Sequence, residues 1–106
     1  MTELRRGTLG FCVLAWLDDR ERYAVELVGE LTGSETLAAG AGTLYPMLTR
    51  LRTDGLISST WRESPAGPPR RYYRLTDDGR DALKSFRGEW TRFRDAVDDL
   101  LGKGVS

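Results

Sequence analysis

The chain has 106 residues, 40% of them hydrophobic, which suits one domain with a modest core that gains stability by oligomerising. The longest apolar run, residues 9–17, is half the length that a membrane span needs and lacks a signal-peptide cleavage pattern, so we expect a cytoplasmic protein. With zero net charge, no histidine, one cysteine and no nucleophile or phosphate-loop motif, the sequence offers no metal or cofactor site, and we expect no enzyme.

Two helices are predicted in the first third of the chain. Residues 3–17 carry apolar side chains on nearly all faces of a helix, which predicts burial against both the chain's own core and a partner. A second helix is expected from about residue 20 to residue 31, with Asp18 or Asp19 as its cap. Its apolar stripe consists of Ala24, Leu27, Val28 and Leu31.

The third predicted helix, residues 41–54, has only a narrow apolar stripe. Leu44, Leu48 and Leu51 form this stripe, and we expect them in the core. Gly55 supplies the C-terminal stop of the helix. The remaining surface of the helix is polar and holds Thr43, Tyr45, Thr49, Arg50 and Arg52.

A β hairpin is predicted next. Residues 56–63 alternate in part and are rich in β-forming side chains, and residues 70–75 pair back onto them. Residues 64–69 read Ser-Pro-Ala-Gly-Pro-Pro, a composition that predicts an irregular turn.

A long last helix is expected after Thr76, which can cap it, with Asp77 and Asp78 in the first turn where negative charge suits the helix dipole. The apolar side chains of this helix recur at alternating spacings of three and four residues. That spacing is the heptad pattern of a helix that pairs with another helix. The predicted dimer seam consists of Leu83, Phe86, Trp90, Phe93, Val97 and Leu100.

The order helix, helix, helix, hairpin is that of a winged helix-turn-helix, so we predict a mainly α fold with a small β hairpin. Residues 1–75 would form the winged-helix domain, and residues 76–106 a C-terminal dimerisation helix and tail. Residues 42–75 carry six basic and two acidic side chains, although the whole chain is neutral. Such segregated charge favours a nucleic-acid partner for the third helix and the hairpin.

Several short motifs extend over most of the chain. They are Gly42–Pro46 (GTLYP), Leu48, Arg50–Leu51, Asp54–Ile57, Trp61, Gly67–Pro68, Arg70–Thr76 (RRYYRLT) and Gly79, and the opening Leu4–Leu9 joins them. Together they resemble the PadR family of bacterial regulators, and the length and single C-terminal helix resemble its short subfamily. The resemblance implies a winged-helix homodimer on double-stranded DNA with an inverted-repeat operator, and repression that a ligand or another signal relieves.

The sequence departs from the family pattern at two places. Gly40–Ala41 stands where the family often has Ser-Pro at the start of the third helix, and glycine is a weaker cap by only a few tenths of a kcal/mol. Tyr23–Glu26 reads Tyr-Ala-Val-Glu instead of the frequent Tyr-Gly-Tyr-Glu, so any role of a second tyrosine is lost.

Candidate DNA contacts on the third helix are its exposed polar side chains. Thr43, Tyr45 and Thr49 are expected to contact base edges and phosphates. Arg50 is a candidate phosphate clamp, with a surface ion pair as the alternative.

In the hairpin, Arg70 and Arg71 follow the proline-rich turn and are expected to grip the DNA backbone. Tyr72 is a further candidate DNA contact. The sequence leaves open whether Tyr72 or Tyr73 instead packs beneath the hairpin.

Trp90 has two interpretations: packing in the dimer seam, or stacking on a ligand. In some members of the family that this chain resembles, a tryptophan at the corresponding place lines a central cleft and stacks on flat aromatic compounds. The resemblance therefore implies a planar aromatic effector, with Trp16, Phe86 and Phe93 as the apolar walls of its site.

The sequence thus predicts a sequence-specific DNA-binding transcriptional regulator, a repressor released by a small molecule or another signal. The alternative is a winged-helix module that binds a protein partner and no DNA. The basic character of residues 42–75 favours DNA, because a hairpin that binds protein is usually more apolar.

Overall fold

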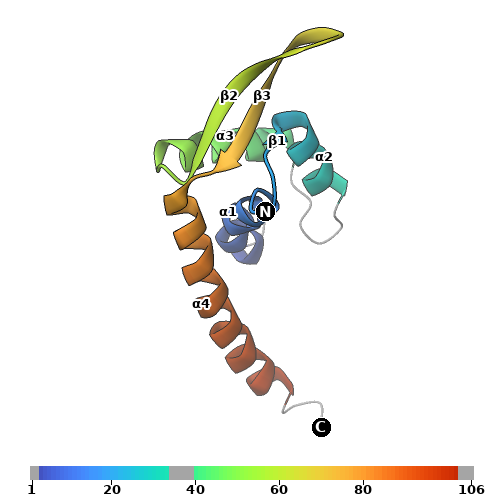
Figure 1. Ribbon diagram of the computed structural model, residues 1–106. Helices are drawn as coiled ribbons and strands as arrows, with labels where there is room; N and C mark the ends of the chain where they lie inside the picture. The colour runs from blue at the N-terminus through green and yellow to red at the C-terminus, as the bar shows by residue number, and fades with distance from the viewer. Residues whose placement is uncertain (1–2, 34–39, 103–106) are drawn as a thin grey trace.

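The computed structural model describes residues 3–33 and 40–102, with side chains from residue 8 onward. The elements in these ranges are α1 (Glu3–Trp16), β1 (Arg22–Tyr23), α2 (Ala24–Gly33), α3 (Ala41–Thr53), β2 (Ile57–Ser64), β3 (Gly67–Leu75) and α4 (Asp77–Gly102). The strands form an antiparallel sheet in the order β1-β3-β2. The β2–β3 hairpin, called the wing below, projects on one side of the helices, and α4 leaves on the other side (Figure 1). This is a winged-helix fold with an added C-terminal helix.

The core lies between α1, α2, α3 and the base of the sheet. Leu44, Leu48 and Leu51 of α3 are all less than 10% exposed, which confirms the predicted stripe. Gly55 ends α3 with a φ of 79°, and the Leu56 N–H donates to the Leu51 carbonyl at 3.0 Å, as expected for a glycine stop. The other buried apolar residues are Leu9, Val13, Leu14, Leu17, Leu27, Leu31, Met47, Ile57, Tyr73, Leu75 and Leu83.

A two-residue strand, β1, occupies the place where the second helix was expected to begin. The helix starts at Ala24 instead of near residue 20, so that part of the prediction is wrong. The strand is held by Arg22, which is 9% exposed. Its Nε donates to the Trp16 carbonyl at 2.7 Å, and its Nη1 pairs with Glu30 Oε1 at 2.6 Å. β1 itself forms by pairing with Tyr72 and Tyr73 of β3, and because these residues are distant in sequence, no local pattern predicts the strand.

The wing is longer, and its turn shorter, than the sequence indicated. β2 continues through Ser64 and β3 already begins at Gly67. The irregular turn expected over residues 64–69 is therefore wrong except for residues 65 and 66, which lie between the strands. The pairing register shifts beyond Arg62, where β3 has one residue more than β2. Pro68 and Pro69 lie at this bulge, where the missing N–H of proline is tolerated.

The predicted cap of the last helix is confirmed. Thr76 Oγ1 accepts a hydrogen bond from the Gly79 N–H at 3.0 Å and donates to the Gly55 carbonyl at 2.6 Å. The Thr76 N–H donates to the Leu56 carbonyl at 3.1 Å. Gly79 is buried against the same carbonyl, so the first turn of α4 is fixed to the turn that follows α3.

α4 passes beside α1 and then extends away from the rest of the molecule (Figure 1). The ring of Phe86 stacks on Phe11 with a centroid distance of 4.0 Å and an interplanar angle of 5°. The radius of gyration is 16.0 Å, above the roughly 13 Å of a compact domain of this size. Much of the apolar side of α4 therefore has no cover in the described part of the chain. None of the described helices is long and apolar enough to cross a membrane.

Candidate nucleic-acid interface

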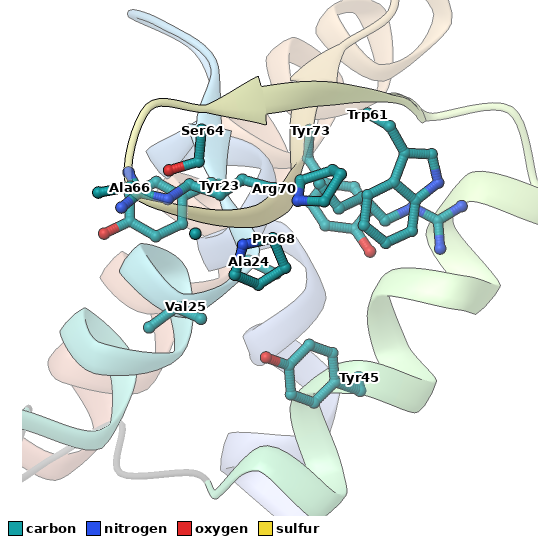
Figure 2. Close-up of a pocket in the computed structure, with 13 residues that line it drawn as sticks. Tyr23, Ala24, Val25, Tyr45, Trp61, Ser64, Ala66, Pro68, Arg70 and Tyr73 are labelled. Atoms are coloured by element: carbon teal, nitrogen blue, oxygen red, sulfur yellow. The ribbon is translucent and has the colours of Figure 1, made fainter.

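A groove of about 620 Å³ runs between the wing, α3 and the start of α2. We call it the wing groove, and its principal lining residues are Tyr23, Tyr45, Trp61, Arg70, Arg71 and Tyr73. Figure 2 shows Tyr45 on α3 with its hydroxyl pointing across the groove toward the start of α2, with Trp61 and Tyr73 at one end of the groove and Tyr23 at the other. Among the described residues that line the groove, Arg70 and Arg71 are the charged side chains and no carboxylate joins them. The wing groove is therefore suited to an anionic partner.

Aromatic rings hold both arginines of the wing groove. The guanidinium carbon of Arg70 lies 4.8 Å from the centroid of the Tyr23 ring. That of Arg71 lies 5.3 Å from the Trp61 ring and 5.9 Å from the Tyr73 ring. Cation–π contacts of this kind orient the planar guanidinium groups in advance, so less freedom is lost when they bind phosphate.

The two tyrosines of β3 have different surroundings, which answers the question that the sequence left open. Tyr73 is 5% exposed and packs beneath the wing, and this burial raises the pKa of its phenol. Tyr72 is half-buried and does not line the wing groove. Its ring lies under the guanidinium of Arg62 at 4.8 Å and beside Tyr23 at 5.7 Å. Because the Tyr23 ring contacts both Tyr72 and Arg70, Tyr72 lies near Arg70 but outside the wing groove.

The predicted contacts on α3 are divided between two flanks of the helix. Tyr45 faces the wing groove, and the exposed Thr49 lies one turn further on, with its Oγ1 donating to the Tyr45 carbonyl at 3.1 Å. Thr43 is half-buried. Arg50 is exposed beside the cleft between α1 and α3, which Phe11 also lines. The structure therefore brings Tyr45 close to the arginines of the wing, but not Arg50.

Two lining residues of the wing groove, Trp61 and Tyr23, are absent from the contacts predicted by sequence. Trp61 stands opposite Arg71 in the β2–β3 register. An alternating strand with a tryptophan facing an arginine is a signal that could have been found, but only with the correct register. Tyr23 belongs to β1, whose position depends on long-range pairing, and no local signal indicated it.

The residues predicted to hold an aromatic ligand lie on α1 and α4, away from the wing. Phe86 and Trp90 are 6.1 Å apart between ring centroids, and Trp90 and Phe93 are also 6.1 Å apart. Phe11, which was not predicted as part of this site, stacks on Phe86. We call the row formed by Phe11, Phe86, Trp90 and Phe93 the aromatic ladder. Within residues 3–33 and 40–102, Trp16 makes no ring contact with the ladder and is half-buried against the core.

The predicted dimer seam on α4 has a buried beginning and an exposed end. Leu83 is 2% exposed in the core of its own chain, so it is a core residue and leaves almost no surface for a partner. The remaining seam is open to different extents: Trp90 and Val97 are half-buried, Phe93 is 60% exposed, and Leu100 and the adjoining Leu101 are 71% and 69% exposed.

A helix with a polar outer face beside a basic wing, joined to a long C-terminal helix, defines a winged-helix regulator of transcription. Residues 13–85 match the family described as "Transcriptional regulator PadR-like family". The chain belongs to this family, in agreement with the motifs of the sequence.

Similar proteins include the transcriptional regulator Rv3488 of Mycobacterium tuberculosis. It is 38% identical over 87 residues, which cover 82% of this chain and 79% of that protein. Among solved structures, a PadR-like transcriptional regulator from Bacillus cereus superimposes with a TM-score of 0.85 and 32% identity, covering 94% of this chain and 97% of that one. A PadR family transcriptional regulator from Eggerthella lenta gives a TM-score of 0.81 and 39% identity, covering 93% and 86%.

Proposed function

We propose that this regulator binds double-stranded DNA sequence-specifically and represses transcription as a homodimer. The observation that carries the proposal is the wing groove, in which two oriented arginines are the charged side chains and the part of the chain that the structure describes contributes no carboxylate. A protein-binding module is the alternative, but a groove with this charge is complementary to phosphate.

In this proposal α3 enters the major groove and the wing follows the DNA backbone. Tyr45, Thr49 and Thr43 contact base edges or the phosphates beside them. Arg70 and Arg71 bind phosphates from the wing, while Arg50 on the other flank of α3 binds a phosphate across the groove. Base contacts and phosphate contacts are thus assigned to different elements.

The proposed homodimer forms through the exposed end of α4. Phe93, Leu100 and the adjoining Leu101 present apolar surface that the described chain does not cover. A two-fold axis would present two copies of α3, which should meet half-sites separated by about 34–36 Å, one helical turn of DNA. An inverted-repeat operator follows from this symmetry.

Direct tests of DNA binding use the purified protein and the region upstream of its own gene. Footprinting should show a protected inverted repeat, and a promoter–reporter fusion should lose expression when the regulator is present. Tyr45→Ala and Thr49→Ala should reduce the preference for this site over random DNA and leave the salt dependence nearly unchanged. Equal loss on both DNAs would refute the assignment of α3 to base reading, and no binding to any DNA would refute the function.

The release signal, in our proposal, is a planar aromatic compound bound at the aromatic ladder, where the two copies of α4 would meet. Stacking adds about 0.5–1.5 kcal/mol per ring beyond area burial. Such a compound would quench tryptophan emission in the wild type and much less in Trp90→Ala. Equal quenching in both proteins, or none with a panel of planar aromatics, would leave Trp90 as a packing residue.

A further inference from the structure

Trp61 is an exposed aromatic side chain of the wing that has no role in the proposed function. It lies on β2 with 64% of its surface exposed. One side of the indole faces the guanidinium of Arg71, which is itself fixed by a hydrogen bond from its Nε to Ser59 Oγ at 3.2 Å. The remainder of the indole is open to solvent in the described chain. The orientation of the indole is therefore fixed by a contact within the chain, although most of the Trp61 surface is exposed.

An exposed tryptophan is not explained by the stability of the wing. The buried residue of this part of β3 is Tyr73, and Trp61 adds little to that packing because most of its surface stays in water. Large aromatic side chains held rigid at the surface are characteristic of binding contacts. Trp61 also shares the wing groove with Tyr45 of α3, so a partner that touches one can touch the other.

The character of the groove identifies the partner. Arg71 lies directly beside the indole, Arg70 precedes it on the strand, and the described lining residues include no carboxylate. The partner must therefore offer negative charge next to an apolar surface within a few ångströms. The backbone of duplex DNA has this alternation, because each phosphate is followed by the apolar face of a deoxyribose.

We propose that Trp61 and Arg71 act as one composite DNA contact, in which the indole packs on a deoxyribose and the guanidinium donates to the adjoining phosphate. The inference rests on the proposed function and adds a residue and a chemistry to it. Since a sugar–indole contact carries no charge, it contributes affinity without releasing counterions. Since deoxyribose is the same in every nucleotide, Trp61 contributes equally on operator and random DNA.

The test measures DNA affinity by fluorescence anisotropy at several salt concentrations. Trp61→Ala should weaken binding to operator and random DNA by a similar factor, about 5–30-fold, and leave the slope of log K against log salt unchanged. Arg71→Ala should lower that slope by about one, and the double variant should lose less than the product of the two single losses. Thr60→Ala, the neighbouring exposed residue of β2, is the matched control and should bind like the wild type.

A spectroscopic readout separates contact from an indirect effect on folding. Saturating DNA should change the tryptophan emission of the wild type, and this component should be missing in Trp61→Phe. If Trp61→Ala binds DNA like the wild type while Arg70→Ala is weakened, the inference fails and the proposed function stands. If Trp61→Ala loses binding to polyglutamate but not to DNA, the groove serves an acidic protein and the inference is overturned. If the wild type binds no DNA, both fail together.

Discussion

Gly79 provides the sharpest test of how the last helix is attached to the winged-helix domain. A Cβ added at this position would lie 1.9 Å from the Leu56 carbonyl oxygen and 2.8 Å from Leu75 Cδ1. The first of these neighbours is backbone, so it cannot rotate away, and α4 would have to shift by about 1 Å or more to reach ordinary contact distance. The Gly79→Ala variant should therefore disturb the junction between α3, the wing and α4.

The magnitude follows from the contacts that such a shift would break. Two hydrogen bonds of Thr76, to the Gly55 and Leu56 carbonyls, join the same junction. Losing them at about 1 kcal/mol each, with overpacking of about 1–3 kcal/mol, outweighs the gain of about 1 kcal/mol in helix propensity, so the net loss is roughly 2–4 kcal/mol.

Gly88 is the matched control in the same helix. Among the described residues, a Cβ there would meet only Arg92 Nη1, at an ordinary 3.5 Å. Gly88→Ala should therefore stabilise the protein by up to about 1 kcal/mol through helix propensity. The same substitution in the same helix is thus expected to act with opposite signs.

Urea unfolding followed by far-UV circular dichroism measures both variants, at one fixed protein concentration because association would contribute to stability. With a slope of about 1–3 kcal/mol/M, the midpoint of Gly79→Ala should fall by roughly 1 M or more, and that of Gly88→Ala should rise slightly. A Gly79→Ala midpoint equal to the wild type, or an equal fall in both variants, would refute the close approach at Leu56.

Three further predictions concern the seam, the wing and the cysteine. Phe93→Glu combined with Val97→Glu should give a monomer in sedimentation at micromolar concentration and weaken operator binding at least tenfold, about 1.4 kcal/mol; a wild type that sediments as a monomer would contradict the proposed dimer. Arg70→Ala should lower the salt slope of DNA binding by about one, whereas Arg92→Ala on exposed α4 should not, and equal slopes for the two variants would remove Arg70 from the phosphate contacts. Burial raises the pKa of the Cys12 thiol, so its contribution to stability is present at neutral pH and is lost as the pH rises above the ordinary thiol pKa; alkylation by iodoacetamide should be several-fold slower in the native protein than in urea, and equal rates would contradict the burial.

The local sequence pattern was sufficient to predict a residue's role where that role concerns only the helix or strand that contains the residue. The α3 stripe of Leu44, Leu48 and Leu51 requires only helical periodicity, and Gly55 and Thr76 mark helix ends by backbone conformation and capping. The parts of the site that were predicted, Tyr45 and the two wing arginines, follow from this local frame and from the distribution of charge.

The features that the sequence did not predict all depend on contacts between distant elements. β1 exists because Arg22 and Tyr23 pair with Tyr73 and Tyr72 of β3, and the length of the wing depends on a bulge that accommodates two prolines. The pairing of Trp61 with Arg71 requires the β2–β3 register, and a shift of one residue would place them on opposite faces. Long-range register is the information that periodicity and composition do not contain.

The attachment of α4 determines how a signal at the proposed dimer seam would reach α3. The helix is fixed at its start by Thr76, and further along its Arg87 pairs at 3.4 Å with Asp18, which lies in the segment between α1 and β1. Phe86 adds the stacking contact with Phe11. These contacts make the first half of α4 part of the winged-helix domain, while the seam residues beyond it extend outward.

In the proposed dimer, a change in packing at the seam would therefore move each domain as a rigid body. Since α3 belongs to that body, the spacing of the two copies of α3 would change, and with it the match to the helical repeat of DNA.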